Sequence, residues 1–181
     1  IKQTKPFNSL EQEAQLSVIR TGALLMDEVE QFLKPYGITA TQYNALRILR
    51  GSEPNGLCRN ALRDRMLTRM PDMTRLLDRL EYAGLVERAR QDEDRRMVRS
   101  RISSAGMKIL ADLDEVTKAE ERRRFGHLDD QQLKDLIDLL ADKLQPQLRR
   151  GVDQECAGRA LHGDARAGPL IAWVSGRADA A

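Results

Sequence analysis

The side chains of this sequence that could do chemistry are concentrated in one arginine-rich block. Residues 57–101 hold twelve arginines and no lysine against eight acidic residues, a net charge of +4 within a chain whose formal net charge is +2. A guanidinium presents a planar set of donors that suits phosphate oxygens and the major-groove edge of guanine. A solvated charged surface would also interleave acids and bases, so charge alone leaves nucleic-acid binding as one of two interpretations.

Patterns that would indicate catalysis or metal binding are weak. The histidines and cysteines, two of each, lie in unrelated contexts: His127, His162, Cys58 and Cys156. They predict no Ser–His–Asp set, no metal site and no disulfide framework. The sequence contains no glycine-rich phosphate loop, and its paired acids Asp129 and Asp130 fit a helix N-terminus. We therefore expect a protein that is not an enzyme and has no cofactor.

The composition also bears on location and partners. No apolar run approaches the length of a membrane span, and no charged and then apolar leader opens the sequence. Aromatic residues make up 4% of the chain, which disfavours stacking on unpaired bases as the main binding mode. We expect a cytoplasmic protein with no membrane partner.

Helical periodicity dominates the first half of the chain. Apolar residues recur at steps of three and four between Leu16 and Leu33, after the capping pattern Ser9–Gln12 and before Pro35. A second capping pattern, Thr39–Gln42, predicts a short and centrally buried helix. Two more helices are predicted over 57–66 and from Pro71 to Ala83, the second with its apolar face opposite its charged residues.

Two alternating runs interrupt the helices. Leu85–Arg90 and Met97–Ile102 alternate roughly between apolar and polar residues, and the wholly polar stretch 91–96 separates them. This pattern predicts a β-hairpin, the one convincing strand pair of the sequence. Two helices follow, begun by Ser103 and by Asp129–Gln132, and the last carries a near-heptad apolar stripe that favours helix–helix association.

Short helices followed by a charged hairpin are the order of a winged helix-turn-helix, and here a family resemblance becomes specific. The stretch Leu76–Arg88, LLDRLEYAGLVER, resembles the recognition helix and first wing strand of the MarR family of transcription regulators. Asp94–Val98 and Ile102–Gly106 resemble that family's Asp-x-Arg wing and the step into its next helix. The resemblance covers residues 9–149. It implies a mainly α fold with a small β-hairpin wing, a winged helix-turn-helix with long N- and C-terminal dimerisation helices.

The resemblance also implies how the chain is divided. Residues 1–38 would form an N-terminal helix that is part of the dimerisation region, and residues 39–104 the winged helix-turn-helix DNA-binding lobe. Residues 105–150 would form the C-terminal dimerisation helices. Alanine and glycine supply 13 of the last 31 residues, so we expect 151–181 to be a poorly ordered tail.

The family's DNA-binding roles can be transferred one residue at a time. The DNA-binding residues that the resemblance implies are Asp72, Thr74, Arg75, Arg79, Asp94, Arg95, Arg96 and Arg99. Arg75 would reach bases, and Arg96 would enter the minor groove, oriented by Asp94. Arg95 and Arg99 would contact phosphates without reading sequence. For each arginine taken singly, an exposed surface charge is the alternative.

The implied function is a sequence-specific regulator of transcription that binds double-stranded DNA. It would act as a ligand-responsive repressor and homodimer on a pseudo-palindromic operator. A small aromatic or phenolic effector would bind in a cleft lined by Met26, Tyr36, Tyr43 and Arg47, although ordinary core packing explains each of these singly.

Two other interpretations of function stay open: a winged-helix adaptor that binds protein, and a redox-sensing regulator that uses Cys58 at a helix start. The chain departs from the family pattern at Cys58, which replaces a hydroxyl residue, and at Arg63, which replaces a small residue.

Overall fold

The computed structural model describes residues 6–68, 72–90 and 98–145. Its elements are, in chain order, α1 (Leu10–Leu33), the 3-10 helix η1 (Lys34–Tyr36), α2 (Ala40–Arg50), β1 (Leu57–Cys58), α3 (Arg59–Arg63), α4 (Met73–Tyr82), β2 (Val86–Arg90), β3 (Val98–Ile102), α5 (Ser104–Phe125), α6 (Asp130–Ile137) and the π-helix η2 (Asp138–Leu144). The chain divides into two compact units, Ile1–Ala111 and Asp112–Ala181. In the described ranges, every helix is too short or too polar to cross a membrane.

Side-chain caps begin the helices where the sequence predicts them. The Ser9 hydroxyl accepts the backbone N–H of Gln12 at the start of α1. Thr39 and Gln42 form a reciprocal capping box on α2, with donor–acceptor distances of 3.2 and 2.9 Å. Both the Ser9 cap and the capping box satisfy backbone donors that a helix start would otherwise leave unpaired. These three- and four-residue patterns are local, so the prediction of where α1 and α2 begin is confirmed.

Helix α2 lies at the centre of the first unit. Its side chains Ala45, Leu46, Ile48 and Leu49 are fully buried, and they lie on more than one stripe of the helix. The helix contacts α1, α3 and β3, which explains why it is apolar on several faces. Fully burying a leucine or isoleucine contributes about 1.5–3 kcal/mol, so this helix supplies much of the core energy that holds the lobe together.

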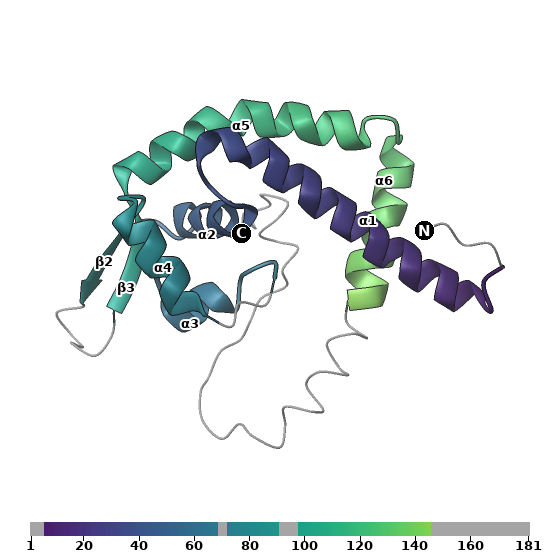
Figure 1. Cartoon of the computed structure of the whole chain (residues 1–181), viewed down its shortest axis with the longest axis horizontal. Helices are drawn as coiled ribbons and strands as arrows, with labels where there is room; N and C mark the ends of the chain where they lie inside the picture. Colours follow the sequence, from purple (N-terminus) through teal and green to yellow (C-terminus); the bar gives the residue numbers. More distant parts are fainter. Residues whose placement is uncertain (1–5, 69–71, 91–97, 146–181) are drawn as a thin grey trace, which may run out of the picture. The chain divides into compact units, whose positions relative to one another are not determined.

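The sheet has three strands in the order β1-β3-β2, all antiparallel. Strands β2 and β3 are the predicted hairpin, paired from Val86 with Ile102 to Arg90 with Val98, and Figure 1 shows them beside α4. The prediction of a single strand pair was wrong: Leu57 and Cys58, expected to begin a helix, form β1 against β3. A two-residue strand is too short to alternate, and its partner lies more than forty residues further along the chain.

The loop between α2 and β1 is clamped to β3. The guanidinium of Arg99 donates through Nη1 to the carbonyl oxygens of Asn55 and Gly56, at 3.3 and 3.2 Å. The next outward-facing arginine, Arg101, pairs with Glu53 at 2.8 Å. Gly56 adopts a left-handed φ of 61° directly before β1. Together these contacts set where β1 lies, and so where α3 begins.

In the second unit, Asp129 and Gln132 form the capping box that begins α6, as the sequence predicts. The expected continuous helix instead changes to the π-helix η2 at Asp138. Ile137, Leu139 and Leu144 are exposed along this segment. The structure does not describe residues 146–181, which include Leu148 at the end of the predicted apolar stripe and the predicted tail, residues 151–181. The domain boundaries after residues 38, 104 and 150 remain predictions.

Candidate nucleic-acid interface

The fourth helix, α4, separates its side chains sharply between two faces. Met73, Leu76, Leu77 and Leu80 are buried, while the exposed side chains are Thr74, Arg75, Asp78 and Arg79. The predicted apolar face is confirmed, although the helix begins at Met73 and not at Pro71. A helix buried on one stripe and polar on the other can present its polar stripe to a partner without losing its place in the core.

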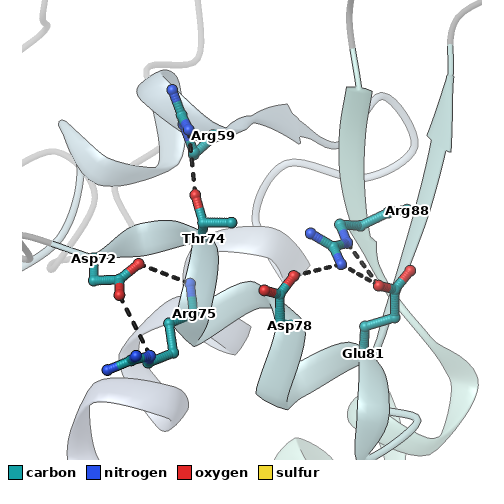
Figure 2. A network of polar contacts seen from close by, with 7 residues as sticks. All are labelled: Arg59, Asp72, Thr74, Arg75, Asp78, Glu81 and Arg88. Atoms are coloured by element: carbon teal, nitrogen blue, oxygen red, sulfur yellow. Dashed lines mark hydrogen bonds and ion pairs between the residues drawn. The ribbon is translucent and has the colours of Figure 1, made fainter.

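Asp72 serves both the helix and its first arginine. Its Oδ1 accepts the backbone N–H of Arg75 at 3.0 Å, which caps α4, and its Oδ2 lies 3.5 Å from Nε of Arg75. Figure 2 shows the guanidinium of Arg75 extending beside this carboxylate. The side chain of Arg75 is 73% exposed. An exposed ion pair contributes about 0–1 kcal/mol, so Arg75 can leave Asp72 for another acceptor at little cost.

A second arginine, Arg59, reaches α4 from the neighbouring helix. Arg59 is exposed and is the first residue of α3. Its Nη1 donates to Thr74 Oγ1 at 3.2 Å, an approach that Figure 2 shows directly. In residue type, nothing in the sequence distinguishes Arg59 from the other eleven arginines of the block 57–101. Its place at the start of the helix before α4 was the one signal that could have marked it.

A third arginine, Arg88, ties the wing to α4. From β2 it donates through Nη2 to Asp78 at 2.7 Å and through Nε to Glu81 at 2.8 Å. The hydrogen bond to Glu81 is the largest influence on Arg88 and raises the pKa of its guanidinium above the usual value. Its side chain is only 24% exposed, so its charge is used inside the lobe. The first strand of the hairpin is thereby held against the helix.

Between these elements lies a groove of about 360 Å³ whose walls include Cys58, Arg59, Thr74 and Arg88. Cys58 is half-buried and is the N-cap residue of α3, where its side chain makes no capping hydrogen bond. This agrees with the observation from the sequence that a cysteine here replaces a hydroxyl residue. Arg59 and Thr74 line the groove beside the start of α4, and Arg88 lines it further along the helix, where its guanidinium binds Asp78 and Glu81.

The remaining predicted DNA-binding residues fall into two groups. Arg79 is exposed on α4, one turn after Arg75. Asp94, Arg95 and Arg96, at the predicted wing tip, lie outside the described residues. Arg99 is half-buried and donates to the loop before β1, a packing role that the sequence analysis did not predict.

The four residues predicted to line an effector cleft lie on α1, η1 and α2. Tyr43 and Arg47 of α2 are brought together, with the Arg47 guanidinium carbon 5.7 Å from the centre of the Tyr43 ring. Tyr36 of η1 has its ring 6.0 Å from that of Phe32. Met26 is 41% exposed on α1. These are packing contacts of ordinary kind, and they leave the cleft a prediction.

Comparison with known proteins gives a consistent result. A model described as "MarR family" matches residues 36–97. A MarR transcription factor from Planctomyces limnophilus is 40% identical, with 75% of this chain and 98% of that chain aligned and a TM-score of 0.58. The fold is also similar to that of a mutant MarR from E. coli complexed with operator DNA, at 24% identity, 76% and 99% coverage and a TM-score of 0.66.

Among curated proteins, the HTH-type transcriptional regulator PrsX of Escherichia coli is 29% identical over 121 residues, 66% of this chain and 73% of that protein. These relatives are regulators of transcription, which confirms the prediction that the protein is not an enzyme. The exposed arginine at the start of α4, the hairpin anchored to α4 and these similarities lead to one conclusion. The chain belongs to the MarR family of winged helix-turn-helix, DNA-binding transcription regulators.

Proposed function

We propose that the protein is a ligand-responsive repressor that binds a pseudo-palindromic operator as a homodimer. In this proposal α4 lies in the major groove and the β2–β3 wing reaches the adjacent minor groove or backbone. A helix fits the major groove, where each base pair presents a distinct set of donors and acceptors. The roles of Asp72, Thr74, Arg75 and Arg79 in binding DNA are part of the proposal.

The observation that carries the proposal is the exposure of Arg75 at the start of α4. Its side chain is 73% exposed, and its one recorded side-chain partner among the described residues is Asp72, in a surface pair. Arg79 follows on the same exposed face. In helix-turn-helix proteins the N-terminal residues of the recognition helix contact base edges, and arginine suits guanine. The relative solved with operator DNA supports the same use of this fold.

Exposed apolar side chains support the homodimer. On α1 they are Leu10, Val18, Ile19, Leu24 and Met26, and on α6 and η2 they are Ile137, Leu139 and Leu144. A second copy of the chain would remove this surface from water, which favours association. Two copies of α4 would then read two half-sites about one helical turn apart.

An effector would act by binding one spacing of the two DNA-binding lobes better than another. The pairing of Tyr43 with Arg47 offers an aromatic face and a cation to a phenolic or aromatic carboxylate. Salicylate is a suitable probe. We expect it to weaken operator binding by the normal protein and to have less effect on Arg47→Ala. An equal response of both proteins would remove Arg47 from the proposed cleft.

Selection of random duplex DNA on the purified protein, followed by sequencing, tests the proposal directly. We expect two inverted half-sites with centres about 10 base pairs apart. Recovery of unrelated sequences, with no preference over random DNA, would contradict specific binding.

Arg75→Ala tests the base-reading role on the selected operator. We expect its preference for operator over random DNA to fall roughly 10- to 100-fold, because one good bidentate contact contributes about 1–3 kcal/mol of discrimination. Arg95→Ala should weaken binding to both DNAs about equally. Arg122→Ala, which changes an exposed charge on α5, is the control. A preference unchanged by Arg75→Ala would defeat the assignment.

A further inference from the structure

We propose that Arg59 is an additional DNA-contacting residue that links α3, α4 and a phosphate of the DNA backbone. One of its nitrogens holds Thr74 at the start of α4, and its other donors bind the phosphate. The inference rests on the proposed function, in which α4 enters the major groove. It adds a residue and a positioning role that neither the sequence motifs nor the family resemblance assigns.

The position of Arg59 at the start of α3 supports a contact with the DNA backbone. In a helix-turn-helix the first helix of the motif crosses the DNA backbone while the second enters the groove. Here α3 is the first helix and α4 the second, and Arg59 is the residue with which α3 begins. The hydrogen bond of 3.2 Å from Arg59 Nη1 to Thr74 Oγ1 keeps the guanidinium beside the exposed face of α4. Thr74 directly precedes Arg75, the proposed base-reading residue, and Figure 2 shows Arg59 reaching Thr74 at the start of α4.

The charge of the Arg59 guanidinium also supports a phosphate contact. Within the described residues of the lobe, carboxylates pair with Arg63, Arg75, Arg88 and Arg101. Arg65 instead donates to the hydroxyl of Ser52, and Arg99 donates to two backbone carbonyls. Across residues 6–68, 72–90 and 98–145, the one polar partner recorded for Arg59 is the neutral hydroxyl of Thr74. A guanidinium has five N–H donors, so the bond to Thr74 uses one and leaves the positive charge uncompensated. Phosphate oxygens supply the missing negative charge and accept the fork of donors.

The hydrogen bond between Arg59 and Thr74 would also couple a bound phosphate to α4. A phosphate bound by Arg59 would fix the distance between the DNA backbone and Thr74 through a single side chain. The hydroxyl of Thr74 in turn limits how the guanidinium can rotate. Arg59 would therefore set the register of α4 on the DNA without reading a base, which is the role of backbone contacts.

Salt dependence of operator binding is the primary test, because each phosphate contact contributes a slope of about 0.9 to log Kd against log salt. We expect Arg59→Gln to lower that slope by about 0.9 for each protomer and to leave the preference for operator over random DNA nearly unchanged. Arg59→Lys should keep most of the slope. Arg63→Gln is the matched control on the same helix, since Asp64 already compensates Arg63, and it should change the slope less.

A double-mutant cycle with Thr74→Val tests the positioning role. We expect Thr74→Val to weaken operator binding at least about threefold more in the normal protein than in Arg59→Gln, because the two residues act together. Additive effects would overturn the positioning role. A slope unchanged by Arg59→Gln, or lowered equally by Arg63→Gln, would overturn the phosphate contact while specific binding by the normal protein stands. Failure of the normal protein to bind any DNA would instead overturn the proposed function itself.

Discussion

At the scale of single residues, the partner of each arginine decides what that arginine can do. Arg88 is mostly buried and shared between Asp78 and Glu81, so moving it would release β2 from α4. Arg75 is mostly exposed and forms a surface pair with Asp72, which contributes about 0–1 kcal/mol. The two residues have the same chemistry in the sequence. Burial makes one of them a structural tie and leaves the other available to DNA.

A substitution of Arg99 can distinguish its packing role in the structure from the phosphate-binding role that the sequence predicted. We expect Arg99→Met, which keeps an apolar stem, to lower the free energy of unfolding by about 1–3 kcal/mol. The reason is that the carbonyls of Asn55 and Gly56 lose their donor. Denaturant unfolding measures this loss. The slope of operator binding against salt should stay unchanged; a lower slope with unchanged stability would restore Arg99 to the phosphate-binding set.

At the scale of elements, the lobe depends on how the α2–β1 loop meets β3. The two-residue strand β1 is too short to hold itself, and its pairing with β3 is reinforced by Arg99 and Arg101. Gly56 lies where the loop approaches closest: a Cβ there would lie 2.5 Å from the carbonyl oxygen of Ser100. Since α3 follows β1 without a break, this close approach also fixes where Arg59 begins its helix.

Alanine substitutions at two glycines with left-handed backbones, Gly37 and Gly56, test this packing by comparison. Gly37 has a φ of 70°, and a methyl group added there would meet open space. We therefore expect Gly37→Ala to lower the free energy of unfolding by about 1–2 kcal/mol from backbone strain alone. Gly56→Ala would add both backbone strain and a close contact with Ser100, so we expect it to lower the free energy of unfolding by roughly 2–5 kcal/mol. Thermal and denaturant unfolding of both variants give the comparison. Equal costs would mean that the loop moves aside at no expense to β3.

At the scale of the whole molecule, the described chain leaves apolar side chains in water on both of its units. Several lie on α1 in the first unit and on α6 and η2 in the second. Removing such surface from water favours association, against the freedom of motion that two molecules lose when they associate. The homodimer that we propose would account for it, and it would also present two copies of α4 to the DNA.

A charge introduced into the second of these surfaces tests the dimer. We expect Ile137→Asp to weaken self-association at least about tenfold, because a carboxylate would lose its water on association. Leu67→Asp is the matched control: Leu67 is 61% exposed, against 55% for Ile137, but it lies beyond α3. Sedimentation equilibrium at micromolar concentration measures both. A normal protein that stays monomeric there, or an Ile137→Asp variant that dimerises equally well, would contradict the proposed interface.

The sequence alone determined the features that depend on neighbours within one or two helical turns. The caps of α1, α2 and α6, the buried face of α4 and the β2–β3 hairpin are written in short patterns, and all of them are present. The family motifs also lie close together, between Leu76 and Gly106, so the fold class followed from them. In each case the residues that stabilise the element are those that form it.

Tertiary structure alone decided the contacts between distant residues. The Arg59–Thr74 bond joins residues 15 apart, the Arg99–Gly56 bond residues 43 apart and the Arg101–Glu53 pair residues 48 apart. No periodicity relates such positions, because their distance depends on how whole elements pack. The short strand β1 and the different uses of Arg59, Arg88 and Arg99 follow from this packing, since an arginine's role depends on the acceptor that the fold brings to it.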